Sequence, residues 1–246
     1  MLRLVFVLCF GAIALFAAPE TPTIPTIDLT LSAPTEPGDL VTTLNIVAIL
    51  TLLVLAPSLI LMATSFARIL IVLSFLRTAM GTQQSPPTQL LVSFALILTI
   101  FIMEPVAKEG YEKGIKPYIA KEIPYDEAFL LASEPFKDFM MRNTRPKDLA
   151  LFYRIRNLEN PQTAQDVPLS IALPAFIISE MKTAFQIGFL LYLPFLVIDM
   201  VISSILMAMG MMMLPPTMIS LPFKILIFIL VDGFNLLTIN LVQSFR

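Results

Sequence analysis

The sequence contains no histidine and no tryptophan, and its only cysteine is Cys9. Without histidine, the chain cannot form a histidine-ligated metal site, a Ser-His-Asp triad or a Cys-His dyad. Charged residues make up only 14% of the 246 residues, whereas soluble domains carry about 25%. The net charge is −2, with no excess of basic residues that would indicate nucleic-acid binding. These shortages argue against an ordinary cytosolic enzyme, and we expect no metal and no cofactor.

Apolar residues are abundant instead, at 57% of the chain. They form four long stretches, at residues 40–64, 90–106, 183–214 and 217–241. A membrane-spanning helix needs about 20 apolar residues, and each stretch is near or above that length. The alternating pattern of a membrane barrel is absent from the sequence. The sequence therefore predicts an all-α membrane protein with long apolar helical hairpins.

The N-terminus resembles a secretory signal peptide at residues 1–18. Arg3 precedes an apolar run at residues 4–16, and small residues follow at Ala17 and Ala18. Pro19 makes this a poor cleavage site, so an uncleaved anchor is the alternative. Cleavage would remove Cys9, and the mature chain could then form no disulfide. Residues 19–39 are rich in proline and threonine, which predicts a flexible extracytoplasmic lead-in.

Residues 107–170 differ from the rest of the chain. They hold 20 of the 34 charged residues, ten of each sign. Amphipathic patterns at residues 133–141 and 148–152 predict helices, so we expect a small extracytoplasmic helical domain. It separates a first apolar hairpin, residues 40–106, from a second, residues 171–246. Arg68 and Arg77 are then expected in a cytoplasmic turn of the first hairpin.

Three ionisable residues interrupt the second hairpin: Asp199, Lys224 and Asp232. Such residues are costly in a membrane helix and often functional. With the turn placed near residues 214–216, Asp199 and Lys224 differ in depth by about 7 Å. We expect a structural ion pair between Asp199 and Lys224. It forms either within the hairpin or between subunits of a staggered ring.

A methionine-rich loop connects the two helices of this hairpin, with the sequence Met-Gly-Met-Met-Met-Leu-Pro-Pro at residues 209–216. Methionine is flexible and apolar, so several copies around an axis could seal a pore and still deform. Met211, Met212 and Met213 are the candidate pore gate. The alternative is that they only pack the loop against neighbours.

Several of these motifs occur together, in one order, in a known family. Residues 64–87, 139–152, 174–189, 194–216 and 221–233 resemble the FliP family, which includes flagellar proteins and their relatives in virulence type III secretion. The similarity extends over roughly residues 60–246. The N-terminal signal favours the flagellar branch, and the virulence branch is the alternative.

The resemblance implies a core subunit of the flagellar type III protein export gate, not an enzyme. Such a subunit forms a pore with FliQ and FliR, through which unfolded flagellar subunits are secreted. It also implies a homo-oligomer, with five copies expected, in contact with other export-apparatus proteins. The location implied is the bacterial inner membrane, in the flagellar basal body. The family's methionine loop is held to act as a gasket, which supports the gate interpretation.

Three residues are candidate contacts between copies: Phe139, Phe152 and Glu180. The two phenylalanines are predicted on helical faces otherwise lined with charge, and filling the core of the small domain is the alternative. For Glu180 the alternative is a solvated helix entrance.

Two other classes of function remain open. A small-solute secondary transporter would often show internal repeats, but residues 40–106 and 183–241 share none. An intramembrane enzyme could use only Asp199 and Asp232, and Lys224 is expected to hold them ionised.

Overall fold

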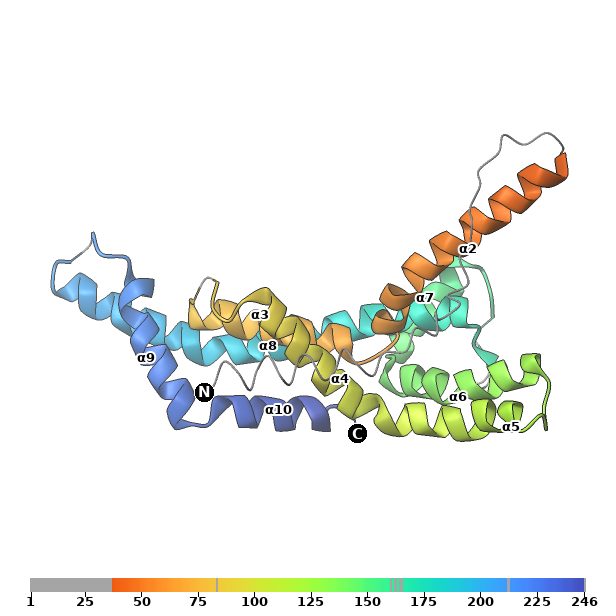
Figure 1. Cartoon of the computed structure of the whole chain (residues 1–246). Helices are drawn as coiled ribbons and strands as arrows, with labels where there is room; N and C mark the ends of the chain where they lie inside the picture. Colours follow the sequence, from red (N-terminus) through yellow and green to blue (C-terminus); the bar gives the residue numbers. More distant parts are fainter. Residues whose placement is uncertain are drawn as a thin grey trace, which may run out of the picture. The chain divides into compact units, whose positions relative to one another are not determined.

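The computed structural model describes residues 37–82, 84–159, 161, 163, 166–211 and 213–245 (Figure 1). These residues form helices and no strand, which confirms the predicted all-α membrane class. The predicted signal peptide and most of the lead-in lie outside the described residues. The chain divides into two compact units between Leu50 and Thr51, and the packing described below belongs to the second unit.

The described helices follow one another along the chain with short connections. In order they are α2 (Pro37–Met62), α3 (Phe66–Met80), α4 (Thr88–Gly110), the π-helical turn η1 (Tyr111–Ile115), α5 (Lys116–Ile119), α6 (Tyr125–Asn143), α7 (Pro146–Ile155), α8 (Leu169–Ala208), α9 (Pro216–Leu230) and α10 (Gly233–Gln243). Within the described residues, three helical segments are long and apolar enough to cross a membrane: Thr43–Met62, Thr88–Ile119 and Leu169–Ala208. A fourth is added if α9 and α10 count as one span with a 64° bend.

Helix α3 occupies the place where the sequence predicted a simple turn, and that prediction was wrong. Ile69, Val72, Leu73 and Leu76 are fully buried, at the spacing of one helix face. Gly81 ends the helix in the left-handed conformation, with φ of 75°. Residues 40–106 therefore hold three helices, not one hairpin, and Arg68 lies on a buried helix face instead of in a solvent turn.

The main core forms where α3 packs along α8. An added Cβ on Gly188 of α8 would lie 2.6 Å from the ring of Phe75, so only glycine permits this approach. Residues from α4 and α10 complete the core around α3, among them Leu91, Ala95, Leu237 and Leu241. This core fixes α8 against the preceding helices.

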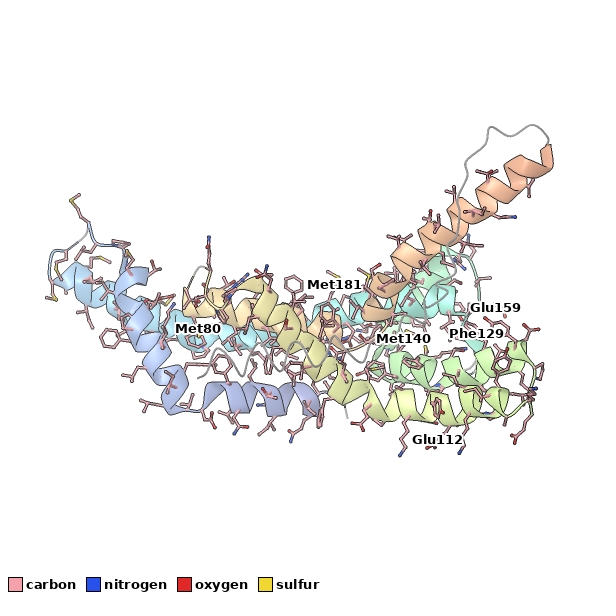
Figure 2. All side chains as sticks on the ribbon, in the orientation of Figure 1. Met80, Glu112, Phe129, Met140, Glu159 and Met181 are labelled. Carbon is pink, nitrogen blue, oxygen red and sulfur yellow. The ribbon has the colours of Figure 1, made fainter. Side chains whose placement is uncertain are left out.

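The charged insert does contain the two predicted amphipathic helices, α6 and α7. Its predicted boundary after residue 106 falls inside a continuous helical run, because α4 continues through η1 into α5. Phe139 and Met140 of α6 are buried together with Met103 of α4 and Phe176 of α8. Figure 2 labels Met140 of this cluster. The insert thus packs directly on the long apolar helices, while its division as a separate domain stays a prediction.

The second hairpin is longer and more bent than predicted. Helix α8 runs unbroken for 40 residues, or about 60 Å, past Pro174 and Pro194. The fourth apolar stretch is two helices, α9 and α10, that meet at Asp232 with left-handed backbone, φ 52°.

Candidate functional site

The tip of the α8–α9 hairpin is built by a glycine, not by the two prolines. Gly210 adopts φ of 76°, and its N–H donates to the Met207 carbonyl at 3.1 Å. The N–H of Met211 donates to the Leu206 carbonyl at 3.0 Å, which completes a Schellman motif. Helix α8 therefore ends at Ala208, and Pro216 opens α9, where a missing N–H costs nothing.

The loop that follows exposes methionine side chains. Met209 is 65% exposed, Met211 36% and Met213 98%, while Met212 lies outside the described residues. A shallow groove of about 220 Å³ lies beside the loop; its lining residues are Ser203, Leu206, Met207, Met211, Leu214 and Pro216. The exposed methionines are thus presented outward, and a role as a seal stays a prediction.

Asp199, nine residues before the end of α8, lies within contact distance of Lys224 of α9 in the same chain. Lys224 Nζ is 2.6 Å from Asp199 Oδ2 and 3.1 Å from the carbonyl oxygen of Ala79. Ser220 Oγ donates to the other carboxylate oxygen at 2.6 Å. Ala79 lies in the last turn of α3, where carbonyls lack helical partners and favour a cation. Lys224, only 3% exposed, joins α3, α8 and α9.

The structure therefore has the pair inside one hairpin, which is the first of the two alternatives, although the sequence had suggested an offset of about 7 Å in depth. That offset came from counting residues 209–214 as helix. Asp199 lies nine residues before the end of α8, and Lys224 lies eight after the start of α9. The two depths then agree within about 2 Å. No second chain is needed to bring these charges together.

A second ion pair, missed by the sequence analysis, anchors the first half of α8. Arg68 Nε donates to Glu180 Oε2 at 2.8 Å, and Nη2 contacts the other carboxylate oxygen. Arg68 also donates to the Ser244 carbonyl at 3.0 Å, and its guanidinium lies 3.8 Å from the Phe245 ring centre. The two side chains are 3% and 0% exposed. An arginine inside an apolar run was the available signal, because such a charge requires a partner.

This geometry corrects two expectations about Glu180. It does not lie at a solvated helix entrance, because no part of it is exposed. Its carboxylate is already covered by the chain's own Arg68, so we no longer propose it as a contact between copies.

A third polar network links α7 to α8. Ser179 Oγ donates to Asp148 Oδ2 at 2.9 Å, and Lys182 Nζ forms an ion pair with the other oxygen. The backbone N–H of Arg145 donates to Ser179 Oγ at 3.0 Å. The hydrogen bond from Lys182 holds the pKa of Asp148 below its usual value, and the Ser179 hydrogen bond adds to this, although burial acts in the opposite direction. Asp148 thus ties the insert to the long helix.

The two predicted contact phenylalanines lie in different surroundings. Phe139 is buried, with ring centres of Phe176 and Phe245 each 6.0 Å away. It fills the chain's own core, so the core alternative describes it and we withdraw it as a contact between copies. Phe152 is half-buried beside a small cluster that includes Tyr153 and Ile171, and its role between copies stays a prediction.

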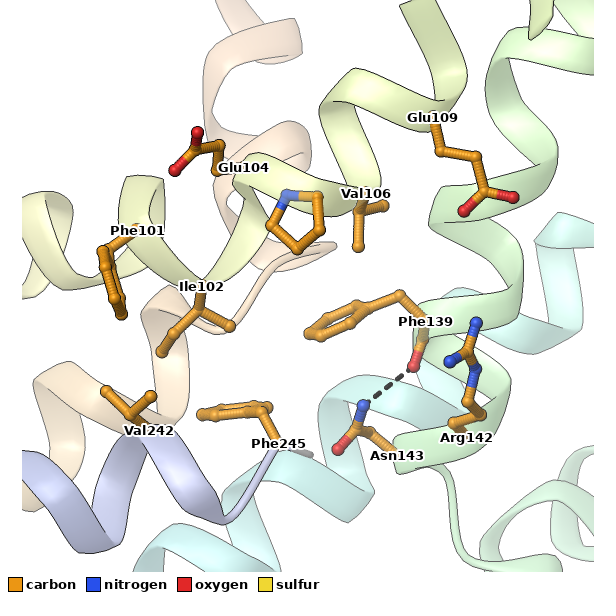
Figure 3. A pocket seen from close by; sticks show the side chains of 11 residues that line it. Phe101, Ile102, Glu104, Val106, Glu109, Phe139, Arg142, Asn143, Val242 and Phe245 are labelled. Atoms are coloured by element: carbon orange, nitrogen blue, oxygen red, sulfur yellow. Dashed lines mark hydrogen bonds between the residues drawn. The ribbon is translucent and has the colours of Figure 1, made fainter. Parts of the chain in front are cut away.

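A pocket of about 410 Å³ lies between α4, α6 and the end of α10 (Figure 3). Phe101, Ile102, Phe139 and Phe245 contribute its apolar walls. The pocket is also lined by side chains of both charges, namely Glu104, Glu109 and Arg142. No sequence pattern indicated this pocket. Across the described residues, no three histidine, cysteine, aspartate or glutamate side chains are placed to hold a metal ion.

Most of the chain matches a known protein family. Residues 49–241 match the FliP family. The chain belongs to the FliP family.

Curated relatives agree with this assignment. The chain is 50% identical over 210 residues to the flagellar biosynthetic protein FliP of Bacillus subtilis, covering 85% of this chain and 95% of the relative. It is 52% identical over 202 residues to the protein of the same name from Caulobacter vibrioides, covering 82% and 76%. With that of Aquifex aeolicus, identity is 44% over 211 residues, covering 85% and 88%. The recognition of a membrane protein of flagellar biosynthesis is thus confirmed.

Proposed function

We propose that this FliP-family chain is a core subunit of the flagellar type III protein export gate. Together with FliQ-like and FliR-like subunits, it forms the pore through which unfolded flagellar subunits are secreted. It works as a homo-oligomer, with five copies expected, in the bacterial inner membrane within the flagellar basal body.

The exposed methionine loop is the observation that carries this proposal. Met209, Met211 and Met213 project from a hairpin tip that the chain does not cover. A soluble enzyme would gain nothing from such a surface, whereas a ring of flexible apolar side chains can exclude water and deform around a polypeptide. The Asp199–Lys224–Ser220 contacts hold the base of the hairpin, so the seal rests on a fixed support.

Replacing the three methionines tests the proposal. We expect Met211→Ala, Met212→Ala and Met213→Ala combined to make cells that overproduce the complex leaky to small ions, while export continues in part. Conductance across a bilayer containing the purified complex measures the leak. Met218→Ala is the matched control, because Met218 is exposed but lies on α9 beyond the loop.

A triple variant that assembles with FliQ-like and FliR-like subunits and stays as tight as the unmodified complex would remove these residues as the seal. Failure of the unmodified chain to co-purify with those subunits would overturn the export-gate assignment itself.

A further inference from the structure

Most charged side chains of helices α3, α8, α9 and α10 are paired within the chain. Helices α3, α8, α9 and α10, with the bend at Asp232, carry seven charged side chains. Five of the seven take part in ion pairs, namely Arg68 with Glu180, Lys224 with Asp199, and Lys182 with Asp148 of α7. The other two, Arg77 and Asp232, form no ion pair within the described residues, and their charges have opposite signs.

Arg77 has polar contacts but no carboxylate. Its Nη1 donates to Thr88 Oγ1 at 3.0 Å and to the Pro86 carbonyl at 3.5 Å, both neutral acceptors. The side chain is only partly buried, at the end of α3 above the α3–α4 loop. Its charge is therefore available to a further partner.

Asp232 is exposed at the bend between α9 and α10. Its Oδ2 accepts a hydrogen bond from the side chain of Asn235 at 3.0 Å, and no cation lies within ion-pair distance in the described part of the chain. Around it the surface is apolar, with Leu230, Val231 and Phe234 all at least half exposed. A carboxylate in such a setting is costly unless a cation covers it together with an apolar surface.

The two unpaired charges lie on different elements, Arg77 near the end of α3 and Asp232 at the α9–α10 bend. Arg77 is two residues from Ala79, whose carbonyl contacts Lys224, while Asp232 is eight residues beyond Lys224 along α9, or about 12 Å. Figure 1 shows the end of α3 and the α9–α10 bend at similar positions along α8, on opposite sides of it. Two different, complementary patches on opposite sides are what a head-to-tail ring requires.

We propose that Asp232 of one copy binds Arg77 of the neighbouring copy in the homo-oligomer. The contact pairs the two remaining charges and covers the apolar surface around the bend. The proposal rests on the homo-oligomer of the proposed function and names the surfaces by which its copies meet.

Glu104 is a less suitable partner for Arg77. It lies sixteen residues along α4 from Thr88, about 24 Å from the α3–α4 loop. It also lines the pocket of Figure 3, which lies between α4, α6 and the end of α10 and not at the α3–α4 loop.

Charge exchange in the whole complex tests the contact. We expect Arg77→Asp and Asp232→Arg each to lower the yield of oligomer at least tenfold, and the double exchange to restore most of it. Asn240→Arg is the control, because it places the same charge on an exposed site of α10 away from the bend. Native mass spectrometry of the detergent-purified complex counts the copies.

Cross-linking provides a second measurement that does not depend on export. In a chain with Cys9→Ser, Arg77→Cys and Asp232→Cys, a short bismaleimide should link copies of this chain into a ladder. An oligomer that forms without any ladder, or a double exchange that restores nothing, overturns the contact while the export-gate proposal stands. Absence of any oligomer of the unmodified chain overturns both.

Discussion

The two halves of α8 share an apolar composition but have different surroundings. In residues 169–188, eight residues are buried; they are Ile171, Ala172, Ala175, Phe176, Ser179, Glu180, Ala184 and Gly188. In residues 189–208, only Phe195 and Leu206 are buried. The first half is packed by α3, α6 and α7, whereas the second packs on α9 along one side and leaves many of its apolar side chains exposed.

The difference separates a packed scaffold from a mostly exposed apolar surface. The two buried polar side chains of the first half, Ser179 and Glu180, are satisfied within the chain. The second half leaves Phe189, Val197, Met200 and Val201 exposed, which is costly in water at about 25 cal/mol per Å². Lipid or neighbouring subunits must therefore cover it, and the methionine loop lies at its end.

The largest effect is expected in the packed half. Arg68→Ala leaves the Glu180 carboxylate buried without a cation, which should cost about 3–5 kcal/mol. We expect loss of folded protein, measured as a lower thermal unfolding midpoint in detergent. Arg154→Ala on the exposed face of α7 is the control.

A double variant sharpens this test. Arg68→Met with Glu180→Leu removes both charges and should recover part of the stability, because well-packed apolar residues can replace a buried pair. An Arg68→Ala protein as stable as the unmodified chain would show that the pair does not anchor α8.

A smaller loss is expected at the base of the exposed half. Lys224→Met removes the cation from Asp199, but the Asp199 side chain is 25% exposed and keeps its hydrogen bond from Ser220. The cost should be about 1–3 kcal/mol. Asp199→Asn combined with Lys224→Met should cost less than the sum of the two single changes, as measured by a double-mutant cycle. Additive costs would argue against a direct interaction.

The smallest effect is expected from the network that joins α7 to α8. The folded state holds the pKa of Asp148 below its unfolded value of about 3.9, so the stabilisation is present above that pH and is lost as pH falls below it. Thermal melts between pH 3 and pH 6 should therefore show an acid loss that Asp148→Asn reduces. If the variant lost as much thermal stability at low pH as the unmodified chain, Asp148 would be excluded as the group responsible.

Local sequence patterns predicted much of this fold, because the formation of a helix depends mainly on residues close to one another in the sequence. The apolar runs around residues 90–106 and 183–208 and the amphipathic segments of α6 and α7 all became helices. The pairing of Asp199 with Lys224 could be anticipated as well, since opposite charges in apolar helices need each other. That the two charges pair within one chain could not be anticipated, because this depends on where Gly210 ends α8.

Composition and motif order were enough to identify the membrane class, the family and the residues of the methionine loop, since they require no coordinates. Which charges meet depends instead on how the helices pack. Arg68 and Glu180 are 112 residues apart, and Ser244 and Phe245 complete their site from the end of the chain. Contacts at such separations follow from how α3 packs along α8, which depends on Gly188 and the ring of Phe75 fitting together. Sequence patterns describe one helix at a time, and therefore contain no information about that fit.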